Sequence, residues 1–127
     1  MNSPFIVADK QGNRCALPRI PTAEAVMRCC KYIAWVDTHG TREKMPTRYG
    51  ARKTFTRKQT WERTAYGLKH DVEGWSPVTK GYGEYQGYVM TEEFILAAVL
   101  CGITIKNLRC GEGFVDCMFE VKKGVES

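Results

Sequence analysis

Basic side chains are concentrated in one part of this sequence, between Thr41 and His70. The window holds nine cationic residues: Arg42, Lys44, Arg48, Arg52, Lys53, Arg57, Lys58, Arg63 and Lys69. Only Glu43 and Glu62 oppose them, so nine bases against two acids give the window +7, while the whole chain of 127 residues carries +5. The excess positive charge is therefore local. Lysine and arginine neutralise phosphates and release the counterions bound to a nucleic acid.

Aromatic residues are interleaved with this charge. Tyr49, Phe55, Trp61 and Tyr66 fall within the window, and Tyr82, Tyr85 and Tyr88 follow at every third position of a glycine-spaced stretch. Exposed aromatic faces stack on unpaired bases, which predicts a surface for single-stranded nucleic acid or RNA. The candidate binding residues are Arg48, Arg52, Lys53, Arg57, Lys58, Trp61, Arg63, Tyr66, Tyr82 and Tyr85.

Each part of this pattern also has a structural interpretation. A basic, partly amphipathic segment is often a solvated face of a protein, and Trp61 and Phe55 are residue types that usually pack in a core. The tyrosines would then anchor the glycine-rich loop to the rest of the chain. These interpretations stay open beside the binding hypothesis.

Catalytic and metal-binding patterns are absent from the sequence. It has no phosphate-binding loop, nucleophile elbow or zinc-ligand spacing, and its two histidines, His39 and His70, stand alone. His70 next to Asp71 is the best single acid–base pair, but it carries no further motif. We assign no catalytic residue, metal or cofactor, and favour a protein that is not an enzyme.

The elements at the two ends of the chain are clearly patterned. Residues 5–7 and 14–17 predict a β-hairpin, and Thr22 is the expected N-cap of an amphipathic helix that ends at Gly40. A second, almost wholly apolar helix is expected from Thr91 to Gly102, followed by strands at 103–105 and 114–121.

The middle of the chain allows two interpretations. Thr56 and Gln59 have the spacing of a capping box, which favours a helix over 57–66 that ends at Gly67 and Leu68. The alternative is a strand through 53–56. Residues 74–87 are rich in glycine and predict a loop, or a loop with a short edge strand.

This order of elements predicts an α+β fold in one domain that covers residues 1–127. We expect a small antiparallel or mixed sheet from the N-terminal and C-terminal hairpins, with two to three helices packed on it.

The cysteines and the ends of the chain indicate a cellular compartment. The six cysteines are Cys15, Cys29, Cys30, Cys101, Cys110 and Cys117. With no secretory signal we expect all of them to be free thiols and the protein to be cytoplasmic. No apolar run approaches the length of a membrane span, so no membrane partner is expected.

Our first hypothesis is a non-enzymatic binding protein that engages nucleic acid, or a nucleic acid–protein complex, through residues 42–69. A second is a small phage-type inhibitor, such as an anti-CRISPR protein, that docks on an acidic surface of a host protein. A third is a sponge for a nucleotide messenger, with the tyrosine- and glycine-rich loop and arginines enclosing its phosphates. The sequence leaves the oligomeric state open.

Overall fold

The fold is that of a computed structural model, which describes residues 4–39, 43–46, 52–55, 57–79 and 81–120. Side chains are described for residues 4–37, 59–79 and 82–120. The helices are α1 (Ala23–His39), α2 (Arg57–Trp61), α3 (Ala65–Glu73) and α4 (Thr91–Leu100). The strands are β1 (Ile6–Ala8), β2 (Arg14–Ala16), β3 (Glu43–Pro46), β4 (Arg52–Phe55), β5 (Trp75–Ser76), β6 (Gly81–Tyr82), β7 (Ile105–Gly111) and β8 (Phe114–Phe119). The predicted α+β class is confirmed.

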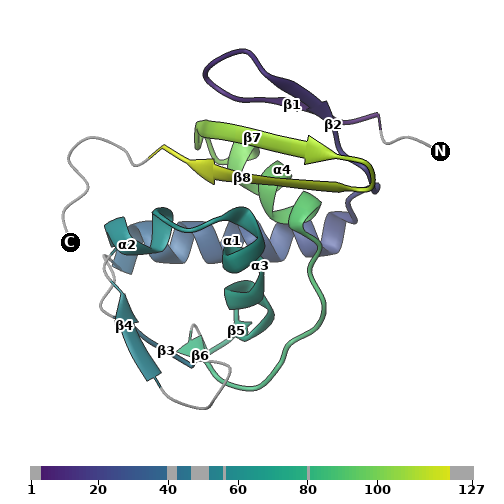
Figure 1. The fold of residues 1–127 in the computed structure, drawn as a ribbon. Coiled ribbons are helices and arrows are strands. Elements are labelled where there is room, and N and C mark those ends of the chain that lie inside the picture. The colour runs from purple at the N-terminus through teal and green to yellow at the C-terminus, as the bar shows by residue number, and fades with distance from the viewer. Residues whose placement is uncertain (1–3, 40–42, 47–51, 56, 80, 121–127) are drawn as a thin grey trace.

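The two predicted hairpins form, but they do not share one sheet. The first strand of the C-terminal hairpin was predicted too early, at 103–105, and is β7 at Ile105–Gly111. β1 pairs with β2 and β7 pairs with β8, each as a separate antiparallel pair. The hairpins lie side by side (Figure 1), and the backbone N–H of Lys10 donates to the carbonyl of Ile105 at 2.9 Å. The Asp9 carboxylate also accepts the N–H of Leu108 at 2.9 Å. The structure joins the two hairpins by these two bonds. We had expected the strands of both hairpins to be hydrogen-bonded in one continuous sheet.

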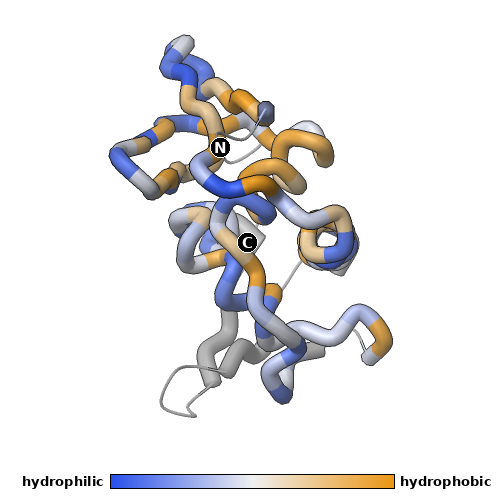
Figure 2. The backbone as a smooth tube through the Cα atoms, turned by 90° about the vertical axis from the view of Figure 1, so that its right-hand side faces the viewer, coloured by the Kyte–Doolittle hydropathy of each residue, from blue (hydrophilic) through white to orange (hydrophobic). Residues whose placement is uncertain are grey.

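Helix α4 lies at the centre of the core. It packs against α1, α3 and β8, and its backbone is orange over most of its length in Figure 2. The helix begins at Thr91, as expected, and Met90 is its N-cap, with the Glu93 carboxylate accepting the N–H of Met90 at 2.7 Å. Glu93 also accepts the Thr22 hydroxyl at 2.5 Å, so the side chain that we expected to cap α1 bonds to α4.

The middle of the chain combines both predicted structures. β4 is a strand paired with β3, and α2 follows it as a short helix. The predicted exit at Gly67 and Leu68 is wrong, because the Thr64 hydroxyl accepts the N–H of Gly67 at 3.2 Å and starts α3 there. Leu68 and Val72 on α3 are fully buried, and their burial stabilises the helix although it contains Gly67. Thr56 lies outside the described residues.

The segment after α3 is the expected loop with a short strand pair, β5 and β6. It then runs back along α3, held by the N–H of Gly83 on the Gly74 carbonyl at 2.9 Å. Farther on, the N–H of Val89 donates to the Glu73 carboxylate at 2.9 Å. These bonds fix the tyrosine-rich segment against α3.

All six cysteines are free thiols, as expected. Within the described part of the chain, no helix is both long enough and apolar enough to cross a lipid bilayer.

Candidate functional site

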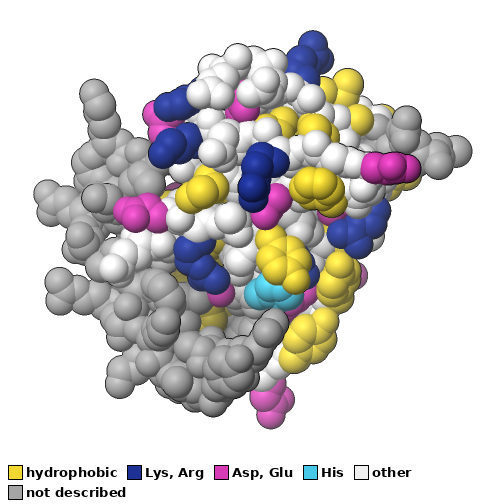
Figure 3. All heavy atoms as spheres, in the orientation of Figure 1, with side chains coloured by type: hydrophobic (Ala, Val, Ile, Leu, Met, Phe, Trp, Pro, Cys, Tyr) yellow, Lys and Arg dark blue, Asp and Glu magenta, His cyan; other side chains and the backbone are white. Residues whose placement is uncertain are grey.

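Two exposed tyrosines contact a buried lysine of helix α3. Tyr66 and Tyr88, here called the tyrosine pair, are 54% and 57% exposed, while Lys69 between them is 3% exposed. The Lys69 ammonium lies 5.4 Å from the ring centroid of Tyr66 and 4.5 Å from that of Tyr88. Both distances are in the range of a cation–π contact. The cyan side chain of His70 is bordered by hydrophobic-class side chains on this face (Figure 3).

Tyr66 is positioned by the contact between the start of α3 and β8. Its backbone N–H donates to Asp116 Oδ1 at 3.1 Å, and Thr64 forms a β-bridge with Met118. Its ring meets the ring of His70 edge to face, with centroids 4.7 Å apart. The backbone of Tyr66 is thus held by Asp116 and its ring by His70.

Tyr88 is positioned by contacts from two other parts of the chain. Nη1 of Arg19 donates to its hydroxyl at 3.3 Å, and the next residue, Val89, is bonded to Glu73. Arg19 is itself fixed by two charge-assisted bonds of 2.9 Å to the buried carboxylate of Glu92. Burial opposes ionisation of Glu92, but the bonds from Arg19 hold its pKa below the usual range.

Glu73 is the carboxylate that connects these parts. Its Oε2 accepts Lys69 Nζ at 3.2 Å, and its Oε1 lies 2.7 Å from His70 Nδ1. Burial opposes its charge, yet bonds from the Val89 N–H, His70 and Lys69 together lower its pKa. Removing a lysine and a glutamate from water costs several kcal/mol per ion. The attraction between the two ions offsets this cost only where their geometry and hydrogen bonds are good, so the buried pair depends on the contacts around it.

A second polar cluster lies farther along α3. Arg63 forms an ion pair with Asp71, and the Tyr32 hydroxyl lies 3.4 Å from Asp71 Oδ2. The hydroxyls of Tyr32 and Tyr82 are 2.8 Å apart. Arg63 and Tyr82 are therefore connected through Asp71 and Tyr32, and their polar groups bond to other protein groups. The suggested His70–Asp71 pairing does not form, because consecutive helix residues diverge whereas His70 and Glu73 share a face.

Asp71 is expected to lower the stability of the protein as the pH rises. Burial raises the pKa of its carboxyl from the ordinary 3.8 to about 6, against the opposing effect of Arg63. Between these values the folded state binds more protons than the unfolded state, so the free energy of unfolding falls with increasing pH. Asp71→Asn has no such ionisation. Relative to wild type, its stability is expected to rise between about pH 4 and pH 7 by on the order of 1–3 kcal/mol.

Urea unfolding of both proteins across that range measures this difference. Because Glu73 and Glu92 have lowered pKa values, they contribute the opposite slope to both proteins and cancel in the comparison. A stability difference that stays flat with pH would contradict an ionisable, buried Asp71.

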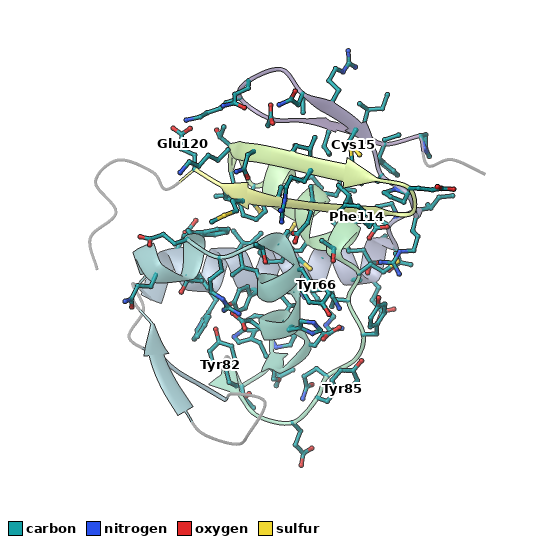
Figure 4. All side chains as sticks on the ribbon, in the orientation of Figure 1. Cys15, Tyr66, Tyr82, Tyr85, Phe114 and Glu120 are labelled. Carbon is teal, nitrogen blue, oxygen red and sulfur yellow. The ribbon has the colours of Figure 1, made fainter. Side chains whose placement is uncertain are left out.

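The predicted site residues do not gather in one described place. Trp61 is 4% exposed and packs against Phe94 and Phe119, so the core interpretation matches its position. Tyr85 is 66% exposed on the segment after β6, apart from Tyr66 (Figure 4). The remaining predicted residues are Arg48, Arg52, Lys53, Arg57 and Lys58, whose side chains lie outside the described ones. The strand pair β3–β4 lies in the segment from Thr41 to His70, here called the basic window. It contacts β6 through β3.

Several residues of this face were not among the candidate binding residues, and Lys69, which contacts both rings, had been counted only toward the charge of the window. Tyr88 belonged to the three-residue repeat of tyrosines and was recognisable in it. His70 follows Tyr66 at the i+4 spacing that brings side chains together on a helix, which is also a readable signal. Arg19 carries no signal, since it lies 69 positions from Tyr88 in the sequence.

A shallow cavity lies beside the tyrosine- and glycine-rich loop. Its volume is about 220 Å³, and it is lined by Ser76, Thr79, Tyr82, Gly83, Glu84 and Gln86. Glu84 is the one charged residue in this described lining, and a carboxylate repels phosphate. Elsewhere among the described residues, no group of three His, Cys, Asp or Glu is placed to hold a metal ion.

The comparisons with known proteins give no further guide to this surface. No family model, no curated protein and no solved structure matches the chain.

Proposed function

We propose that this protein is a non-enzymatic, cytoplasmic binding protein that engages nucleic acid through its basic window and the tyrosine pair. The observation that carries the proposal is the tyrosine pair itself: two large aromatic side chains more than half exposed and held in place by an interior ion pair. Free cysteine thiols support a reducing compartment.

The charge of the chain supports an anionic partner. Both cations of the basic window whose side chains the structure describes, Arg63 and Lys69, are paired with Asp71 and Glu73. By sequence, the segment from Arg42 to Lys58 holds the other seven cationic residues against one acid, Glu43. Such a segment attracts a polyanion over distances set by the Debye length, about 8–10 Å at ordinary salt.

The proposal is tested by binding of labelled DNA and RNA across a salt series from about 50 to 200 mM. We expect affinity to fall steeply with salt. In Arg57→Glu/Lys58→Glu the lost phosphate contacts should reduce the logarithmic salt slope by about 1.4 for a single strand, at about 0.7 per contact. Arg63 is left unchanged because it is paired with Asp71, whose side chain is 8% exposed, so replacing it would also change the stability of the protein.

Lys31→Glu/Lys106→Glu is the matched control. Both lysines are exposed and lie outside the basic window, so the control changes the net charge by the same amount at another place. Equal weakening by the two double variants would indicate a nonspecific charge effect. Absence of binding to any nucleic acid at the lowest salt would overturn the proposal and favour docking on an acidic protein surface.

A further inference from the structure

We infer that the ligand of this surface is a single strand whose unpaired bases stack on Tyr66 and Tyr88. The inference rests on the proposed function and names its substrate class. Stacking on aromatic rings is tolerant of sequence because every base has a π-face, so the inferred specificity is for strandedness.

The spacing of the two rings fits neighbouring bases. Their centroids lie 5.4 Å and 4.5 Å from the same Lys69 nitrogen, so they can be no farther apart than the sum of these distances. Stacked bases in one strand rise by about 3.4 Å each. The tyrosine pair therefore spans at most about three base steps, and one short stretch of a strand can contact both rings.

A duplex would offer no free base faces for these rings to stack on. Its bases already stack on one another, and their faces are reached only after a step is opened at a cost of a few kcal/mol. A single strand presents the same phosphate charge with unpaired bases, so the basic window would attract both forms and the tyrosine pair would distinguish them.

The rings are also fixed in position before any ligand binds. Lys69 contacts both rings, the rings of His70 and Tyr66 meet edge to face, and Arg19 donates a hydrogen bond to the hydroxyl of Tyr88. A side chain that is already ordered loses less entropy on binding. Tyr85 is more exposed than either but makes no ring contact or hydrogen bond to other described residues through its side chain, which makes it the matched control.

The test uses the full chain and labelled single strands of about 12 nucleotides, one of DNA and one of RNA, beside a duplex of the same sequence. We expect Tyr66→Leu and Tyr88→Leu each to weaken single-strand binding by about 5- to 150-fold, the range for loss of one stacked base. Duplex binding should change little. Tyr66→Phe keeps the ring and should retain most of the affinity, and Tyr85→Leu should cost less than either leucine variant of the pair.

An abasic strand separates stacking from charge. It keeps every phosphate but lacks the central bases, so it should bind the wild-type protein as weakly as the intact strand binds Tyr66→Leu/Tyr88→Leu. Removing the bases should then weaken the double variant no further, as expected when two changes abolish one interaction. Circular dichroism and urea unfolding establish that each variant is folded.

The outcomes separate this inference from the proposed function. If the wild type binds single strand and duplex equally, and the leucine variants bind as it does, the tyrosine pair is no stacking surface although nucleic-acid binding stands. If no probe binds the wild type even at low salt, the proposed function itself fails. Preference for RNA over DNA would assign the contact to the 2′-hydroxyl as well.

Discussion

Replacing Glu73 with alanine is expected to lower the free energy of unfolding by about 3–5 kcal/mol, the usual cost of leaving one partner of a buried ion pair uncompensated. Glu73→Ala would strand the ammonium of Lys69, which is almost fully buried. It would also leave the N–H of Val89 without its acceptor. Urea denaturation followed by tryptophan fluorescence measures the change, since Trp75 and Trp61 are both in the core.

Glu73→Gln is the conservative control for this position. The amide keeps an acceptor for the N–H of Val89 but loses the charge that Lys69 faces, so we expect a smaller loss than with alanine. A cost below about 1 kcal/mol for Glu73→Ala, the level of an exposed salt bridge, would contradict the buried pair. It would also remove the support that holds the tyrosine pair in place.

Replacing Trp61 with alanine is expected to cost a similar amount, about 3–5 kcal/mol, for a different reason. Its indole packs edge to face on Phe119 at 5.7 Å and lies 6.3 Å from Phe94, so truncation leaves a cavity between α4 and β8. Thermal or urea unfolding of Trp61→Ala beside Trp61→Phe, which fills part of the cavity, measures the packing contribution.

Trp61→Phe also decides whether Trp61 is a core residue or part of the binding surface. A core residue affects affinity only through the folded fraction, so nucleic-acid binding of folded Trp61→Phe should equal that of wild type. A loss of affinity without a loss of stability would contradict the core position and restore Trp61 to the binding surface.

Most of the fold could be predicted because its signals are local. The apolar run of α4 and the strand–turn–strand patterns at both ends specify their elements within a few residues of sequence. Gly67 was misread as a helix end because two other influences are stronger there. The Thr64 cap is local and was readable, but the burial of Leu68 and Val72 depends on contacts with distant elements.

The candidate surface was only partly predictable, because charge counting does not distinguish exposed from buried cations. Lys69 and Arg63 contributed to the charge of the basic window, yet each pairs with a carboxylate that is itself buried or half-buried. The i,i+4 spacing of Lys69 and Glu73 was visible in the sequence, but such pairs are usually exposed and weak. Their burial, and the bond from Arg19 to Tyr88, depend on the tertiary fold.

The measurement that tests the central claim most directly is an NMR titration of isotope-labelled protein with a short single strand. If the tyrosine pair is the binding surface, the amide signals of Tyr66, His70 and Tyr88 shift first and saturate with the strand, and an equal amount of duplex shifts them less. Shifts confined to the exposed side chains of α1 and the end of α4, such as Met27 and Leu100, would contradict the account.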